Sequence, residues 1–495
     1  MVRPDEKGVV VTDGAHALDP RFLAALATVP TSSWDRWFHE RPASVAAGVP
    51  WEPTLVAAFA LPASAGQAAI CIFETRSGPG TGALHQAVLR RWSGRSPQDA
   101  QILYQEVDAE GTVVWTLASA WADPYLRGWL REALSAGASL RAEGWEWLAT
   151  PERPAASRST DGSSRQLEGR RHDVVLLPPG AVAIAYRHMT HGGQPELDLL
   201  RHLERVPGIR VAPTLLGSAI VRAPNGERTA SAVLEDIEAD AATVRSVLVG
   251  RLQRALDGDP SLQAVALDDV RAVGIITREL HAALGRPFEQ GVLAGAQAAA
   301  LADVETWVAR AWTALSQATL AAQASTRAEA TRLLPALSML PGKLQQFAAA
   351  AERAPGLVHR THGNLRLDTI LMAPPRVLSV VEFDGDALLP DAERIAPQSP
   401  WRDVARLLVS LAEAAAAAAT LVGGDEKAFE IAWLWEREAR KAYLEGYGTG
   451  GGALHALLAI FELEFASQYL TDALASGGDT AVAAHTLQRL SRTIP

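Results

Sequence analysis

The residues best suited to chemistry lie in the last third of the chain, in two short segments. The first reads Thr361-His-Gly-Asn-Leu-Arg-Leu-Asp-Thr and combines a histidine, an amide and an arginine. The second, Leu378-Ser-Val-Val-Glu-Phe-Asp-Gly-Asp, ends an apolar run in three alternating carboxylates, Glu382, Asp384 and Asp386. Carboxylate oxygens suit Mg²⁺, so the second segment is a candidate metal site.

The acidic row has a second interpretation, which the sequence leaves open. Carboxylates that follow an apolar strand can also cap the junction of strand and loop, or simply face solvent. Glu382 and Asp384 are therefore candidate metal ligands, with a purely structural role as the alternative.

The elements around these segments divide the chain into a β-rich part and a helical part. Apolar runs bounded by Pro and Gly predict strands at Leu55–Leu61, Ala68–Phe73, Gln101–Val107, Thr112–Ala118, Asp173–Leu177, Ala181–Tyr186, Leu215–Val221 and Ala230–Leu234. Pro224-Asn-Gly predicts a hairpin turn. After Ala242 the pattern is helical, interrupted by short strands at Leu357–Val381. These patterns predict a two-lobed α+β fold with its ligand site in the cleft between the lobes.

Composition narrows the classes of partner and compartment. The 495 residues carry a formal charge of −10, which disfavours nucleic acid and anionic membranes as partners. One cysteine, Cys71, excludes an intramolecular disulfide, and no run of apolar residues reaches the length of a membrane span. We expect a cytoplasmic protein.

Three segments, in order, resemble the core of maltokinases and, more distantly, of aminoglycoside-phosphotransferase-type kinases. They are the two segments above and Ser399-Pro-Trp-Arg-Asp-Val-Ala. Arg36-Trp-Phe, Thr277-Arg-Glu-Leu-His and Phe461-Glu-Leu-Glu-Phe are similar to further landmarks of that family. The resemblance implies a protein-kinase-like fold with an N-terminal cap at residues 1–120, a small lobe at 121–245 with a linker near 151–164, and a large helical lobe at 246–495.

In the large lobe, the resemblance places altered residues at the catalytic positions. The family's catalytic aspartate falls at Asn364, flanked by His362 and by Arg366 in place of a second histidine. The residues that would bind the metal fall at Thr369 and Glu382, with Asp384 beside them. Asn364 cannot take a proton, and losing a general base typically costs about 10²–10⁴ in rate. His362 is expected to pack the loop, and Asp403 to bind its backbone amides, as the family counterpart does.

In the small lobe, the resemblance implies a missing cation. The phosphate-binding lysine falls at Ile184, and its acidic partner on the next helix at Asp198. The nearest candidates for binding a nucleotide are Arg187 and the phosphate-loop residues Arg170, Arg171 and His172. No lysine occurs between Lys7 and Lys343, so a shift in alignment does not supply one.

Three functions follow from this pattern and stay open at the level of sequence. The favoured one is a pseudokinase that scaffolds or regulates a trehalose- or α-glucan-metabolising enzyme, such as a trehalose synthase, a partner that only the resemblance implies. The second is an atypical ATP- and Mg²⁺-dependent kinase of maltose or an aminosugar. The third is a sugar or nucleotide sensor. Trp401 is the tryptophan we expect near the cleft, where an aromatic face could stack on a sugar.

Overall fold

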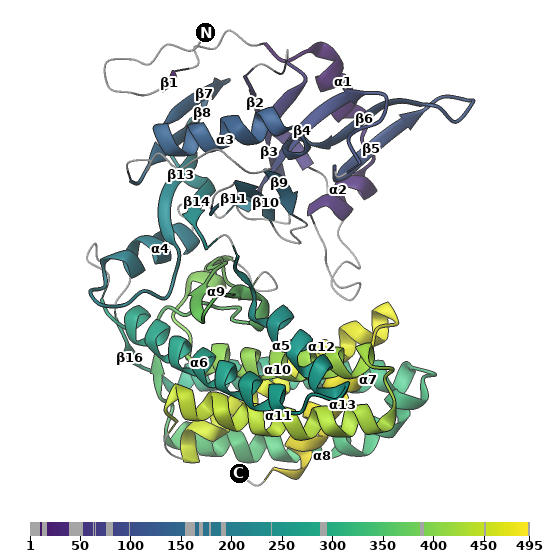
Figure 1. The fold of residues 1–495 in the computed structure, drawn as a ribbon, viewed down its shortest axis with the longest axis vertical. Helices are drawn as coiled ribbons and strands as arrows, with labels where there is room; N and C mark the ends of the chain where they lie inside the picture. The colour runs from purple at the N-terminus through teal and green to yellow at the C-terminus, as the bar shows by residue number, and fades with distance from the viewer. Residues whose placement is uncertain are drawn as a thin grey trace. The chain divides into compact units, whose positions relative to one another are not determined.

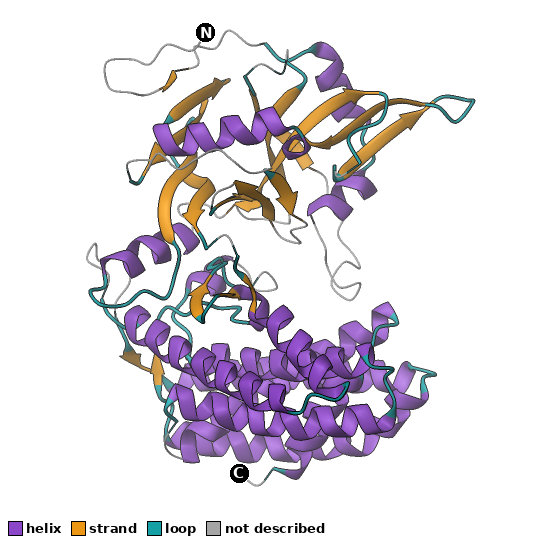
Figure 2. Cartoon of the chain, viewed as in Figure 1, coloured by secondary structure: helices purple, strands orange, loops and turns teal. Residues whose placement is uncertain are grey.

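The computed structural model describes residues 10–11, 17–38, 53–62, 64, 66–75, 83–98, 100–153, 164–167, 172–177, 180–189, 195–238, 240–287, 295–386, 391–449 and 452–493. The chain forms two compact units. Unit 1 comprises residues 1–41, 48–201 and 213–239, and unit 2 comprises residues 42–47, 202–212 and 240–495. Strands dominate unit 1 and helices dominate unit 2 (Figures 1 and 2). The predicted α+β fold with a β-rich part and a large helical part is confirmed.

Unit 1 contains two sheets. The larger has the order β1-β7-β8-β13-β14-β11-β10-β9, whose strands in that order are Val10–Val11, Ala138–Ala142, Trp145–Pro151, Thr214–Arg222, Arg228–Asp236, Ala181–Tyr186, His172–Leu177 and Arg165–Leu167. The smaller has the order β2-β3-β4-β6-β5, with β12 also paired to β4; these are Pro53–Ala60, Ala68–Thr75, Ala83–Ser93, Val113–Ser119, Ile102–Val107 and His188–Met189. The predicted hairpin at Pro224-Asn-Gly joins β13 to β14, with Gly226 at φ +87°.

Sequence analysis did not predict β4, β7 and β8. Strand β4 carries several polar side chains, which weakens its apolar signal, yet it lies in the interior of the smaller sheet between β3 and β6. The buried Gln86 amide donates to the carbonyl oxygens of Tyr186 and Ser231, 3.3 and 3.1 Å away. Those partners come from strands far along the chain, so only tertiary pairing makes a polar residue favourable in β4.

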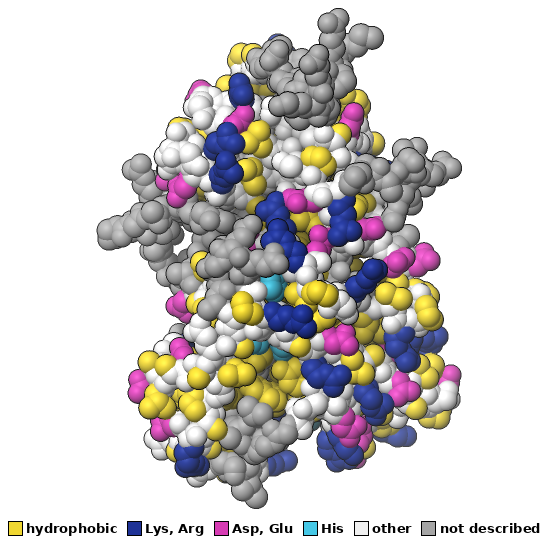
Figure 3. Space-filling view, turned by 90° about the vertical axis from the view of Figure 1, so that its left-hand side faces the viewer, with side chains coloured by type: hydrophobic (Ala, Val, Ile, Leu, Met, Phe, Trp, Pro, Cys, Tyr) yellow, Lys and Arg dark blue, Asp and Glu magenta, His cyan; other side chains and the backbone are white. Residues whose placement is uncertain are grey.

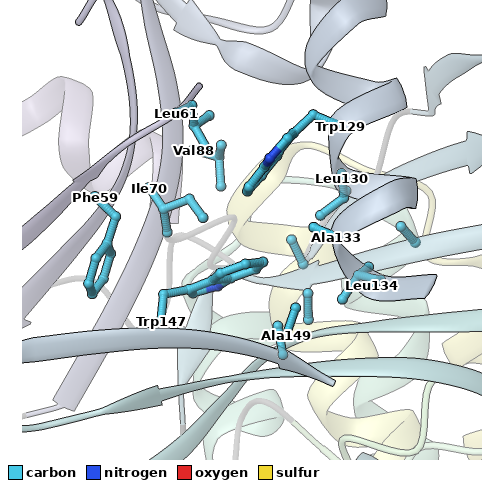
Figure 4. Packing of buried hydrophobic residues seen from close by; sticks show 14 of the residues in the cluster. Phe59, Leu61, Ile70, Val88, Trp129, Leu130, Ala133, Leu134, Trp147 and Ala149 are labelled. Atoms are coloured by element: carbon cyan, nitrogen blue, oxygen red, sulfur yellow. The ribbon is translucent and has the colours of Figure 1, made fainter. Parts of the chain in front are cut away.

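Two apolar cores hold unit 1 together. The first lies between the two sheets and helix α3 (Pro124–Ala136), where Trp129 and Trp147 meet with ring centroids 5.6 Å apart (Figure 4). The second packs helices α1 (Pro20–Thr28) and α2 (Thr31–Phe38) on the smaller sheet, with Trp34 against Phe73 at 4.6 Å. Because β3 points alternate side chains into different cores, it is buried on both faces.

Unit 2 is a helical body with two short sheets. Its helices are α5 (Val244–Leu256), α6 (Ser261–Leu284), α7 (Leu301–Ala324), α8 (Ala328–Arg353), α9 (Asp391–Ile395), α10 (Trp401–Leu421), α11 (Glu426–Tyr447), α12 (Gly452–Ser476) and α13 (Ala481–Arg492). Strands β15 (Ala242–Thr243), β18 (Ile370–Ala373) and β19 (Val377–Val380) form one sheet, and β16 (Gln297–Ala298) with β17 (Leu357–Val358) the other. The predicted interruption of the helices near Leu357–Val381 is confirmed.

Helix α10 has the length and apolar composition of a membrane span. It is the one described helix that meets this criterion, and 72% of its apolar window is buried inside the structure. Burial of this kind is typical of the central helix of a helical body. Figure 3 shows acidic and basic side chains interspersed over one face of the molecule.

Candidate functional site

The loop that contains Asn364 is held by a buried carboxylate. Asp403, in the first turn of α10, accepts hydrogen bonds from the backbone N–H groups of His362 and Gly363, both at 2.9 Å. The Asp403 side chain is 1% exposed, so these bonds form away from water and are correspondingly strong. The structure confirms the predicted role of Asp403 in fixing the loop.

His281 and Tyr447 orient the Asp403 carboxylate. His281 Nε2 lies 3.2 Å from Asp403 Oδ2, and His281 Nδ1 lies 2.9 Å from the Tyr447 hydroxyl oxygen. Burial alone would raise the pKa of Asp403, but the hydrogen bond and charge of His281, with the hydrogen bond from the Gly363 amide, lower it below its usual range. Burial, with the nearby Asp403 charge, raises the pKa of Tyr447. The carboxylate therefore stays ionised and Tyr447 stays protonated at neutral pH.

His362 is a structural residue of this loop. It is fully buried, and its Nε2 lies 2.9 Å from the Val381 carbonyl oxygen, which can only accept. Its Nδ1 accepts from the Asn364 N–H at 3.3 Å. These two contacts assign the neutral tautomer with the proton on Nε2. The histidine thus connects the loop to the strand end at Val381, as predicted for a packing residue and not as a proton donor to substrate.

Asn364 presents an amide where a carboxylate is expected. The residue is half-buried, and no described residue forms a hydrogen bond with its side chain. Gly363 precedes it at φ +85°, and a Cβ on Gly363 would lie 2.9 Å from the Cα of Gly385. Because this close approach excludes any side chain at position 363, the loop backbone and the acidic segment pack directly together. The framework is ordered, but its central side chain takes up no proton.

Arg366 and Thr369 stabilise the segment after the loop. Arg366 Nη2 lies 2.9 Å from Glu413 in α10 and 3.6 Å from Asp368. Burial lowers the pKa of Arg366, but Glu413 and Asp368 more than offset this and raise it. The Arg366 guanidinium thus pairs with carboxylates on both sides, Glu413 of α10 and the neighbouring Asp368.

The placement of Thr369 speaks against metal binding by its hydroxyl. The residue is 2% exposed, and its Oγ1 accepts from the Arg366 N–H at 3.0 Å and donates to the Arg366 carbonyl at 3.1 Å. Both bonds close the turn Leu367–Thr369 locally. The hydroxyl acts as a brace for that turn.

The acidic row lies beside this framework. Glu382 adopts a left-handed backbone with φ +64°, which is uncommon for a residue other than glycine. Asp384 and Asp386 are buried, and Asp386 lies 3.9 Å from the Arg402 guanidinium. Arg402 in turn forms a two-pronged pair with Glu464 of α12, at 2.6 and 3.0 Å. The Phe461-Glu-Leu-Glu-Phe landmark therefore has a structural meaning, since its second glutamate holds the arginine next to Asp403.

The described residues do not form a ready metal centre. Within the described ranges, no group of three or more His, Cys, Asp or Glu side chains is placed to hold a metal ion. The Thr369 hydroxyl is committed to the backbone, which leaves Glu382 and Asp384 of the predicted set; Mg²⁺ bound through two carboxylates would take its other oxygen ligands from water and substrate phosphates.

Arg187, one of the predicted nucleotide-binding residues of unit 1, is buried and already has partners. Arg187 is 3% exposed, and its guanidinium donates to Asp173 at 2.7 and 2.9 Å and stacks over the Trp37 ring at 5.0 Å. It further donates to the side chain of Gln101 and to the Trp37 carbonyl. This arginine is thus occupied inside unit 1, and the placement argues against a phosphate contact.

Of the remaining predicted residues of unit 1, those that the structure describes do not form a phosphate cradle. His172 is buried at the start of β10, with its ring edge-on to Tyr186 at 5.4 Å. Ile184 is buried in the centre of the larger sheet, whereas Asp198 is exposed on helix α4 (Pro195–Arg205). Arg170 and Arg171 lie outside the described residues.

Trp401 does not offer the aromatic face that stacking on a sugar would need. Its side chain is 7% exposed and lies edge-on to Tyr447, with ring centroids 5.4 Å apart. The ring therefore packs beside the His281–Asp403 pair and has no free face for a sugar. Position at the start of α10 was visible in the sequence, but the direction of the side chain was not.

Comparisons with known proteins identify the fold. No family model matches the chain. In sequence it is similar to glucosamine kinase of Mycolicibacterium smegmatis, with 26% identity over 263 residues, 52% of this chain and 61% of that kinase. The alignment thus spans less than two thirds of the relative's length.

The similarity to solved structures extends further along the chain. A glucosamine kinase in complex with glucosamine, ADP and inorganic phosphate has a TM-score of 0.58 and 19% identity, covering 93% of this chain and 98% of the other. A second crystal form has a TM-score of 0.60 and 20% identity, covering 96% and 98%. At this identity the likeness establishes the fold, which is kinase-like. A closer kinship with maltokinases stays a prediction.

Proposed function

We propose that this protein is a pseudokinase, a kinase-fold relative of sugar kinases that binds its ligands without efficient phosphoryl transfer. The observation that carries the proposal is the loop of His362 and Asn364. Asp403, His281 and Tyr447 hold its backbone in place, yet the side chain it presents is an amide. Such a loop retains its shape but lacks a group that can accept the hydroxyl proton.

Two further features support the proposal. The chain has no lysine between Lys7 and Lys343, so the small lobe lacks a lysine that could neutralise a triphosphate. Arg187, the arginine nearest to that position, already donates to Asp173. Charge neutralisation and proton acceptance would therefore both be impaired, and the two losses multiply in rate.

The ligand we propose is an aminosugar, because the similar proteins are glucosamine kinases, one of them solved with glucosamine, ADP and inorganic phosphate. A trehalose- or α-glucan-metabolising enzyme as partner, and a cytoplasmic location, stay predictions of the sequence.

The second candidate is a slow ATP-dependent sugar kinase with an atypical site. The close packing of Gly363 on Gly385 favours it, since it brings the acidic row next to the Asn364 loop. A sugar or nucleotide sensor is the form of the non-catalytic proposal in which ligand binding is the function. Binding of nucleotide or sugar with no turnover would fit it.

A turnover assay on the full chain tests the proposal. Wild type, Asn364→Asp and Asn364→Ala are incubated with ATP, Mg²⁺ and glucosamine or maltose, and ADP release is measured beside thermal stabilisation by each ligand. We expect no ADP release above the protein-free blank from any of the three proteins, because restoring the carboxylate does not restore the missing cation. Circular dichroism verifies that each variant is folded.

The outcomes separate the functions. Robust turnover by the wild type would refute the pseudokinase and support the second candidate. A gain of about 10²–10⁴ in Asn364→Asp over wild type would show that only the general base was missing. Stabilisation by ATP or glucosamine with no ADP release from any protein is the result that the pseudokinase proposal predicts, and it would show that the site retains ligand binding of the kind a sensor needs.

A further inference from the structure

Unit 1 contains a cavity that has no part in the kinase-like site described above. Its volume is about 390 Å³, within the usual range for small-molecule pockets. The residues that give it chemical character are Trp145, Glu74, Glu227 and Asn225, and Val56 and Leu84 are among its apolar walls.

The cavity continues the core between the two sheets. Along β3, Ile70 and Ile72 point into that core, and Glu74 is the next residue on the same face. Val56 and Trp145 pack against the same core. A carboxylate thus replaces the aliphatic side chain that would have continued the apolar row.

Two hairpin turns lie beside the cavity. The turn before Trp145 contains Gly144 at φ +86°, and a Cβ there would lie 3.5 Å from the Pro224 side chain. The β13–β14 turn is ordered by Asn225, whose side-chain oxygen accepts from the Glu227 N–H and whose amide donates to the Glu227 carboxylate, both at 3.0 Å. The Glu227 carboxylate is therefore oriented by the turn itself.

The charge of the lining is one-sided. Two glutamates and no Lys, Arg or His line the cavity among the described residues. No described residue forms an ion pair with Glu74, which is half-buried. An indole ring beside carboxylates attracts a cation by its quadrupole as well as by charge.

We propose that this cavity binds a small organic ammonium ion, with the cationic centre between Trp145 and Glu74 and the body of the ligand against Val56 and Leu84. Both a quaternary amine and the protonated amine of an aminosugar share this chemistry. The site is separate from the Asn364 loop, so the proposal does not depend on whether the protein transfers phosphate.

Calorimetric titration of the full chain tests the site with a matched pair of probes. Choline carries a quaternary ammonium, and its neutral isostere has carbon in place of nitrogen. We expect choline to bind at least about tenfold more tightly than the isostere, and Glu74→Gln and Trp145→Leu each to weaken choline by about tenfold or more. Glu110→Gln is the control, because Glu110 is an exposed carboxylate in the β5–β6 turn and does not line the cavity.

A second arm distinguishes the two sources of the amine. Glucosamine and the neutral N-acetylglucosamine are titrated into wild type, Glu74→Gln and Asn364→Ala. Glucosamine binding that Glu74→Gln weakens and Asn364→Ala leaves unchanged assigns the aminosugar to this cavity. Equal affinity for choline and its isostere, or unchanged choline binding in both Glu74→Gln and Trp145→Leu, would overturn the proposal whatever the turnover assay shows.

Discussion

At the scale of single residues, a series of buried polar contacts stabilises the loop that contains Asn364. Tyr447 contacts His281, His281 contacts Asp403, and Asp403 holds the amides of His362 and Gly363. Each buried polar atom in this series has a partner, so the contacts rigidify the loop instead of leaving desolvated groups. The same contacts would hold a catalytic loop in place. Asn364 is therefore conspicuous, because this rigid loop presents an amide where a catalytic loop would present a carboxylate.

His359, beside this series of contacts, makes stability depend on pH. Burial, with the neighbouring His281, lowers its pKa from 6.5 to about 4. Between these values the unfolded chain binds a proton that the folded chain does not, so the free energy of unfolding decreases as pH falls from about 6.5 and levels off below about 4. The total change is about 3 kcal/mol. Urea midpoints measured across this range check the decrease.

The matched variant for this prediction is His359→Asn, which has no group that titrates there. We expect its stability to fall less steeply than that of wild type between about pH 6.5 and pH 4. Asp403, whose pKa is below its usual range, stabilises the fold above the ordinary pKa of an aspartate, and that contribution is lost only as the pH falls further. Parallel pH profiles of wild type and His359→Asn would contradict the assignment.

At the scale of elements, helices α6 and α11 cross in backbone contact. A Cβ on Gly274 would lie 2.2 Å from the Tyr443 carbonyl oxygen, and one on Gly446 would lie 2.2 Å from the Arg271 carbonyl oxygen. The absence of a side chain at each glycine thus allows the backbone of the other helix to approach closely. Because of this crossing, His281, which lies further along α6, is next to Tyr447 at the end of α11.

Gly274→Ala should therefore separate the two helices and lower the free energy of unfolding by about 1–3 kcal/mol, the range for overpacked cores. Gly250→Ala is the control, because this glycine lies in helix α5 and an added Cβ meets no atom within 4 Å. There we expect a gain of up to about 1 kcal/mol from helix propensity and a less flexible unfolded chain. Denaturant titration compares the two, and an equal effect of both substitutions would refute the crossing.

At the scale of the whole molecule, each of the two units has its own interior. Residues 202–212 belong to unit 2, where His202 Nε2 lies 3.0 Å from the Ala283 carbonyl and the Val380 N–H donates to the Val211 carbonyl at 2.7 Å. A unit with its own core can fold alone. We expect a fragment of residues 240–495 to be helical and to unfold cooperatively, at a lower temperature than full-length protein because it lacks those contacts.

Circular dichroism at increasing temperature checks this expectation, with a fragment of residues 1–239 as the β-rich counterpart. Native-like helix content without a cooperative transition in the 240–495 fragment would show that its core depends on unit 1.

The sequence alone carried much of the fold and part of the site. The family resemblance implied that Asp403 braces the Asn364 loop, and alternation and turn residues located most strands of unit 1. Local patterns suffice there because neighbouring residues determine strand, turn and helix start. The polar strand β4 was missed, since its partners lie far away along the chain.

What the sequence determined by itself is which chemical groups are present: an amide at Asn364, and no lysine between Lys7 and Lys343. Tertiary structure alone decided what each charge contacts. Arg187 pairs with Asp173 and stacks on Trp37, Arg366 pairs with Glu413, and these choices follow from sheet register and helix packing, which bring distant residues together. Long-range contacts of this kind leave no periodic signal, because they depend on where whole elements pack and not on the spacing within one element.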